Sequence, residues 1–206
     1  MKKFAVLFIF FLLIMLPGRA LSQIPKFTFG PKIGFSSSSL TTNVDTLTEK
    51  FRMGLMGGVF VRFNSKYFYI QPEVLMVSKG GIFESQSQAF REDVFINSID
   101  VPVMFGLRLL PHKEFCIRLH GGPFFSYIID KTITVNGNDL ASAVADKQLK
   151  DAYVGYQAGV GFDLLQFSVD FRLEQGLGNI HKVLNGGLDD NWTPRLYNIS
   201  LALKLL

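Results

Sequence analysis

The sequence predicts an all-β protein, an eight-stranded antiparallel up-and-down transmembrane β-barrel. Apolar side chains recur at every second position in eight segments, and the connections alternate between short turns and long polar loops. In each segment one face is free of charged residues, whereas the other face is mixed. Alternation with period two is typical of a β-strand. Short turns at one end and long loops at the other are the layout of a membrane barrel.

The first 22 residues are predicted to be a signal peptide. Two lysines precede an apolar run of 13 residues, and Ala20 and Ser22 supply the small side chains of a peptidase site. Gln23 would therefore begin the mature chain, and residues 23–206 would form one barrel domain. The alternative is a membrane-anchoring helix, but the apolar run is short for a span of about 20 residues.

Composition gives no support for a nucleic-acid partner. The formal net charge of the 206 residues is +4, and removal of Lys2, Lys3 and Arg19 with the signal peptide lowers it to +1. The single cysteine, Cys116, excludes an internal disulfide. Mean hydropathy is +0.25, which is high for a soluble secreted protein. The apolar residues beyond the signal peptide must therefore be distributed over many short segments.

Eight segments have the alternation of strands. They are residues 27–35, 51–63, 67–78, 98–109, 115–127, 151–164, 167–176 and 197–206. In 51–63, "FRMGLMGGVFVRF", every odd position is apolar, whereas Arg52 and Arg62 share the other face.

The connections alternate as regularly as the strands. Short turns are predicted at 64–66, 110–114 and 165–166, and long loops at 36–50, 79–93, 129–150 and 177–193. We expect residues 140–150 to form a helix inside the third long loop. An even number of strands places both termini with the short turns, at the periplasmic end of an outer-membrane barrel.

The distribution of charge indicates which face meets lipid. The face without charges is continuous over all eight segments, so we expect it to point outward and the mixed face to line the lumen. The alternative is an exported soluble barrel of lipocalin type that binds a small apolar ligand. Such a carrier would have to hold about a dozen like-facing charges in its core, which is costly.

Several segments together resemble the PorT-like outer-membrane β-barrel family of Gram-negative bacteria. The resemblance rests on "FYIQPEVLMVSKGG" (68–81), "INSIDVPVMFGLRL" (96–109), "IRLHGGPFFSYII" (117–129) and "GYQAGVGFDL" followed by "VDFRLEQGLGNI" (155–180). It implies a small barrel in the cell outer membrane. The family's namesake serves a protein secretion and gliding apparatus. The long N-terminal extension associated with that member is not seen here, so a secretion role is left open.

Candidate catalytic and metal-binding residues are sparse. His112, His120 and His181 fall in separate segments without the clustered cysteine or carboxylate spacing of a metal site. The outward face offers no histidine and no Ser-His-Asp set for acyl transfer to lipid. We therefore expect no enzyme activity, no metal and no cofactor.

The charged residues on the inward face are the one candidate functional cluster in the sequence. Lys32, Glu73, His120, Arg172 and Glu174 are predicted near mid-height, whereas most of the others lie toward the short turns. The full predicted network is Lys32, Arg62, Glu73, Asp100, Arg108, Arg118, His120, Asp163, Asp170, Arg172, Glu174 and Lys204. Eight strands leave room only for side chains in the lumen, so we expect these charges to pair and fill it. The alternative is a narrow ion channel.

These predictions define the expected partners. The outward face would contact outer-membrane lipid, and the four long loops would offer surfaces to other envelope proteins. We expect a monomer with a role in membrane structure, surface interaction or an envelope or secretion complex.

Overall fold

The computed structural model describes residues 25–41, 47–85, 91–109, 114–135, 138–139, 151–177 and 193–205. The predicted signal peptide and the helix predicted at 140–150 lie outside these ranges. All regular structure within them is β-strand. Among these residues no helix is long and apolar enough to cross a membrane.

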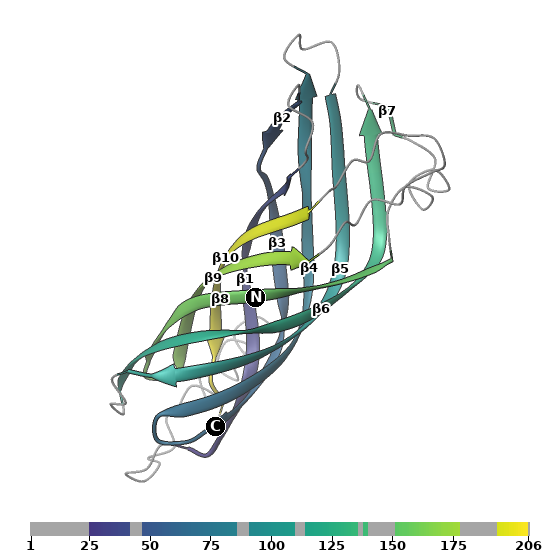
Figure 1. The fold of residues 1–206 in the computed structure, drawn as a ribbon. Coiled ribbons are helices and arrows are strands. Elements are labelled where there is room, and N and C mark those ends of the chain that lie inside the picture. Colours follow the sequence, from purple (N-terminus) through teal and green to yellow (C-terminus); the bar gives the residue numbers. More distant parts are fainter. Residues whose placement is uncertain are drawn as a thin grey trace, which may run out of the picture.

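The strands form one closed antiparallel barrel, which confirms the predicted fold class (Figure 1). Their bounds are β1 (Phe27–Thr41), β2 (Leu47–Lys50), β3 (Arg52–Asn64), β4 (Phe68–Ser85), β5 (Arg91–Arg108), β6 (Phe115–Val135), β7 (Asn138–Asp139), β8 (Ala152–Leu164), β9 (Phe167–Leu177) and β10 (Thr193–Leu203). Eight of them close the ring in the order β1-β3-β4-β5-β6-β8-β9-β10, with β10 returning to β1. The short β2 and β7 pair with β4 and β6 outside this ring.

Both ends of the described chain lie beside short turns. The amide of Asn64 donates to the carbonyl of Lys26 at 2.8 Å, and the amide of Lys204 donates to the carbonyl of Gln166 at 2.7 Å. We call this the turn end of the barrel. In the two-residue turn between β8 and β9, Leu165 has a φ of 51°, the positive value that tight hairpins require.

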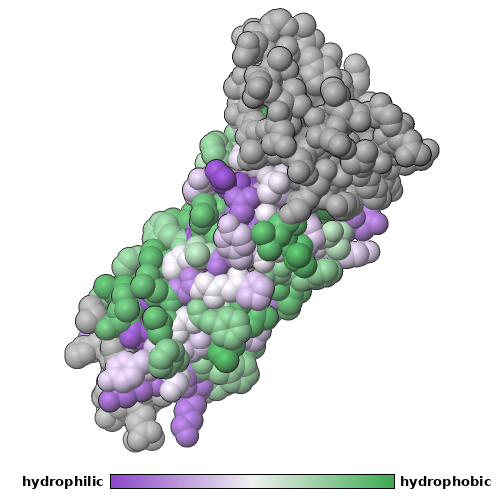
Figure 2. Space-filling view, in the orientation of Figure 1, coloured by the Kyte–Doolittle hydropathy of each residue, from purple (hydrophilic) through white to green (hydrophobic). Residues whose placement is uncertain are grey.

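The outer face of the ring is apolar, as the alternation predicts. Val59, Val74 and Phe105 point outward and are exposed, and Figure 2 shows apolar side chains over much of the visible barrel wall. The soluble-carrier alternative is therefore wrong, because such a carrier would turn its polar face to water and its apolar face inward. Only lipid matches an outer face of this kind.

A row of polar side chains marks the upper edge of the apolar band. Ser78 donates to Asn97 at 2.8 Å, and Asn97 donates to Asp130 at 3.4 Å, on the outside of β4, β5 and β6. On the opposite wall Arg195 donates to Gln175 at 3.0 Å. The membrane-facing surface therefore ends here, well below the tops of the longest strands.

All four predicted long loops are partly strand, which corrects their boundaries, although the fourth loses only Leu177 and Thr193 at its ends. Residues 36–41 continue β1, 79–85 continue β4, and β5 begins at Arg91. Residues 128–135 belong to β6. Figure 1 shows β4, β5 and β6 rising beyond the ends of β8, β9 and β10. We call residues 79–85, 91–97 and 129–135 the strand extension.

The strand extension escaped prediction because its alternation fades. Outside a membrane neither face of a sheet must be uniformly apolar, so "SKGGIFES" and "REDVFIN" mix charged and apolar residues on both faces. The register also shifts between Asn97 and Ser98 of β5. Opposite this bulge, Ile129 and Asp130 are both exposed, which reverses the phase of alternation beyond them.

Candidate functional site

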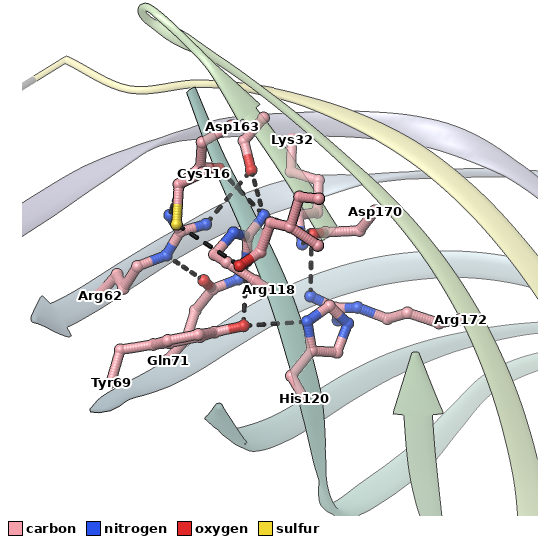
Figure 3. A network of polar contacts seen from close by, with 12 residues as sticks. Lys32, Arg62, Tyr69, Gln71, Cys116, Arg118, His120, Asp163, Asp170 and Arg172 are labelled. Carbon is pink, nitrogen blue, oxygen red and sulfur yellow. Dashed lines mark hydrogen bonds and ion pairs between the residues drawn. The ribbon is translucent and has the colours of Figure 1, made fainter. Parts of the chain in front are cut away.

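The lumen holds a cluster of charged side chains (Figure 3). Every residue of the predicted network lies on the inner face, and all except Lys204 are buried. Inward orientation follows directly from the strand alternation, because the apolar positions between them point to lipid. What alternation cannot give is which charges meet across the lumen.

Glu73 is the centre of the cluster. Arg172 donates to both of its carboxylate oxygens, Nη2 to Oε1 at 2.6 Å and Nη1 to Oε2 at 2.8 Å. The ammonium of Lys32 donates to Oε1 at 2.8 Å. The side-chain amide of Gln71 is a further donor. A two-pronged guanidinium–carboxylate pair of this kind is among the stronger hydrogen-bonded arrangements in proteins.

Asp170 joins this centre to the turn end of the lumen. Its Oδ2 accepts from Lys32 at 2.8 Å and from Arg172 at 3.1 Å. Its Oδ1 accepts from Arg118 at 2.7 Å. One carboxylate therefore serves three cations.

Asp163 serves the cations nearest the turn end. It lies 2.9 Å from Nη1 of Arg62, 3.0 Å from Nη2 of Arg118 and 3.7 Å from Nζ of Lys204. The hydroxyl of Ser168 accepts from Arg62 at 3.2 Å and from Arg118 at 2.6 Å. The two guanidiniums are thus held side by side by shared acceptors.

His120 is held by a tyrosine rather than by a carboxylate. The Tyr69 hydroxyl accepts from Nη1 of Arg118 at 3.0 Å and lies 2.9 Å from Nδ1 of His120. Because that hydroxyl accepts from Arg118, its own proton is free to point to Nδ1. Nε2 of His120 is buried and has no hydrogen-bond partner in the described part of the chain. Among the residues that the structure describes, this histidine hydrogen-bonds neither to a carboxylate nor to a serine or cysteine.

A second group lies on the side of the cluster away from the turn end. Lys79 donates to Asp100 at 2.7 Å and to the Tyr153 hydroxyl at 2.8 Å, and lies 3.6 Å from Glu174. Gln157 connects the two groups, since it donates to Glu174 at 2.8 Å and accepts from Arg172 at 3.5 Å. Glu174, predicted at the height of Glu73, is therefore bound in this upper group.

Several ion pairs join opposite walls of the barrel. In the eight-strand ring, β4 and β9 are separated by three strands in either direction, and so are β3 and β8. Glu73 and Arg172 connect the first two strands, and Arg62 and Asp163 connect the other two. These contacts span the full width of the lumen.

Two glycines make room for bulky members of the cluster. A Cβ atom added to Gly106 would lie 2.1 Å from Cζ of Tyr69. One added to Gly161 would lie 2.5 Å from Nη2 of Arg118. Both glycines face inward, so a larger residue at either would displace the ring or the guanidinium.

Sequence reasoning missed Lys79, Tyr69, Gln71 and Tyr153. Tyr69 and Gln71 share the inward phase of Glu73 but carry no permanent charge, so a search for charges does not find them. Lys79 falls in the predicted loop 79–93, but in the structure it belongs to β4 and continues the inward phase of Glu73.

Arg108 is the predicted network member that the structure does not pair. Its side chain has no hydrogen bond or ion pair within the described residues, and its Nε is buried without a partner. Within the same residues no group of three or more histidine, cysteine or carboxylate side chains could hold a metal ion.

Comparison with solved structures found other small outer-membrane proteins. Ail of Yersinia pestis, in complex with the heparin analogue sucrose octasulfate, is 13% identical, with 87% of this chain and 99% of that chain covered and a TM-score of 0.46. OprG of Pseudomonas aeruginosa is 12% identical, with 86% and 93% covered and a TM-score of 0.46. Neisserial surface protein A is 9% identical, with 85% and 96% covered and a TM-score of 0.49. These likenesses are of fold alone.

The family comparison is more informative than these structures. No curated protein matches the sequence. A family model described as "Outer membrane protein beta-barrel domain" matches residues 21–182, which is more than half of the chain. Together with the closed ring and its apolar outer face, this match makes the chain an integral barrel of the cell outer membrane and a member of the outer membrane protein β-barrel domain family.

Proposed function

We propose that this protein is a non-enzymatic, monomeric barrel whose lumen is closed by ion pairs and whose strand extension and loops form an interaction surface outside the cell. The observation that carries the closed lumen is the set of contacts between opposite walls, above all the two-pronged Glu73–Arg172 pair. Glu73 and Arg172 are both buried, at 2% and 5% exposure. Ions would have to break these pairs to pass.

The chemistry of the site favours a structural role over catalysis. An acyl-transfer enzyme needs an activated nucleophile that a lipid can reach. His120 faces the lumen, is buried, and contacts the Tyr69 hydroxyl instead of a serine. Incubation of the purified barrel with lipopolysaccharide should therefore release no fatty acid.

Conductance across a planar lipid bilayer tests the closed lumen. The wild-type barrel should pass no steady ion current, whereas the double variant Glu73→Ala/Arg172→Ala should conduct. The matched control is Arg195→Ala on the outer face, which should behave as the wild type. A steady current through the wild-type barrel would contradict the closed lumen and favour the narrow ion channel.

The strand extension supports an interaction role. Residues 79–85, 91–97 and 129–135 stand clear of the apolar band, and they carry the connections that would face the outside. Partners would be other envelope proteins, and a PorT-like secretion complex is one candidate. Co-purification of cross-linked envelope proteins with the full chain, compared with a variant lacking residues 79–97, should identify partners that depend on this surface.

Orientation in the membrane has its own test. Protease added to intact cells should cut in the connections 42–46, 86–90, 140–150 and 178–192 and spare the turn at 110–114. Cleavage at that turn with the other connections untouched would invert the proposed topology.

A further inference from the structure

The turn end of the lumen carries more positive than negative charge. Six inward-facing cations lie in the cluster around Glu73, Asp163 and Asp170. These cations are Lys32, Arg62, Arg108, Arg118, Arg172 and Lys204. Among the described residues of this cluster, three carboxylates therefore face six cations, and the excess positive charge is at Arg108 and Lys204.

Arg108 and Arg118 stand directly opposite each other in the β5–β6 register, on the inner face of the wall. Like charges at directly opposed positions repel and destabilise a sheet unless an anion lies between them. Arg118 pairs with Asp163 and Asp170 on one side, although its own Nε is also buried without a partner among the described residues. Arg108 has no side-chain partner in the described chain, and its buried Nε donor is unused.

The nearest described carboxylate, Asp163, does not pair with Arg108, although its Oδ1 accepts no hydrogen bond. Asp163 already lies within 3.0 Å of both Arg62 and Arg118 and reaches Lys204 at 3.7 Å. The ammonium of Lys204 is attracted by the carboxylate of Asp163. It is repelled by the three guanidiniums of Arg62, Arg118 and Arg108. A buried donor without an acceptor costs free energy, and a further anion beside Arg108 would supply an acceptor.

We propose that the turn end of the lumen binds a phosphate-class oxyanion between Arg108, Arg118 and Lys204. A phosphate group brings up to two negative charges and several acceptor oxygens, which suits guanidinium donors better than a single carboxylate does. Solvent reaches the outer members of this site, since the Lys204 side chain is 17% exposed and Arg108 is 9% exposed. Arg62 and Arg118, at 2% and 0%, form its fixed floor.

This site goes beyond the proposed function, because a barrel with a closed lumen needs no ligand. An oxyanion bound here would neutralise the surplus charge and add stability to the turn end. It would also make that stability depend on the phosphate available at this face of the membrane.

The test is phosphate-dependent stability of the folded barrel in zwitterionic detergent at constant ionic strength. Inorganic phosphate should raise the unfolding temperature of the wild type in a saturable way, whereas acetate should not. Arg108→Gln should abolish the rise. Lys66→Gln, an exposed change in a turn at the same end, should keep it.

The unfolding temperature in phosphate-free buffer shows whether Arg108→Gln itself changes the stability of the barrel. Because Arg108→Gln removes the repulsion with Arg118, it should be at least as stable as the wild type in phosphate-free buffer. In saturating phosphate the wild type should become the more stable of the two. Equal effects of phosphate and acetate, or an unchanged phosphate response in Arg108→Gln, would overturn the proposal.

A second arm identifies the source of the phosphate group. Barrels are placed in phosphatidylcholine bilayers with and without phosphatidic acid, in buffer free of phosphate. A rise in unfolding temperature that requires both phosphatidic acid and Arg108 would assign the site to a lipid headgroup. A rise with inorganic phosphate alone would assign it to a soluble ligand, and a rise with neither would overturn the proposal.

Discussion

Removal of Glu73 should destabilise the barrel, and removal of Arg172 as well should add less than its own separate cost. Glu73 holds Arg172 through two hydrogen bonds and Lys32 through one. Glu73→Leu takes the carboxylate away and leaves Arg172 and Lys32 buried beside Asp170, at 3.1 Å and 2.8 Å, with Gln157 as a further acceptor for Arg172 at 3.5 Å. Arg172→Leu leaves Glu73 with Lys32 and Gln71.

The magnitude follows from the burial of the pair. Breaking a buried ion pair by removing one partner costs about 3–5 kcal/mol. Because Asp170 still accepts from both cations, we expect Glu73→Leu to lie near the lower value, about 3 kcal/mol. We expect a similar loss for Arg172→Leu. The double variant should lose less than the sum of the two by about 1–3 kcal/mol, which is the range for residues in direct contact.

The assay is urea unfolding of the refolded barrel in detergent, followed by the mobility difference between folded and unfolded protein on unheated gels. The control pair is Glu73→Leu with Arg195→Leu, since Arg195 lies on the outer face and bonds to Gln175. Those two losses should add. If Glu73 and Arg172 also gave additive losses, or if Glu73→Leu left unfolding unchanged, the pair would not stabilise the barrel and the reasoning would fail.

Further predictions concern the lipid face, the packing of the lumen and the N-terminus. Val59→Arg, at mid-height on the outer face, should cost about 2–4 kcal/mol in urea unfolding from lipid vesicles, whereas Ser37→Arg, level with Tyr197 near the edge of the apolar band, should cost about 0–1 kcal/mol. Gly106→Ala should destabilise by about 1–3 kcal/mol in the same assay, because the new methyl group overlaps the Tyr69 ring. An equally stable Gly106→Ala barrel would contradict that packing. N-terminal sequencing of the membrane-extracted protein should begin at Gln23, and a chain that begins at Met1 would refute the predicted cleavage.

The candidate site was only partly predictable. Period-two alternation places Lys32, Glu73 and Arg172 on the same inner face, and counting from the turns places them at similar heights. Their mutual contacts depend on which strands face each other across the ring and on how the register staggers around it. Both the facing of the strands and the stagger of their register are properties of the closed sheet. Neither can be read from the sequence of a single strand.

The lengths of the strands were likewise only partly predictable from the sequence. Each strand must keep one face free of charge because that face contacts lipid. The eight strands and their inward and outward faces can therefore be predicted from alternation alone. The strand extension carries no such constraint, and its length became visible only in the pairing of β4, β5 and β6.

The sequence by itself determined that this chain is a membrane barrel with a charged interior, because the hydrophobic requirement of lipid acts on every strand separately. Tertiary structure alone decided that Glu73 meets Arg172 across the lumen, that Lys79 gathers the upper group, and that Arg108 faces Arg118 without a carboxylate of its own. The physical reason is that ion pairing in the lumen depends on distances between strands that are far apart in the chain. Those distances are fixed only when the sheet closes.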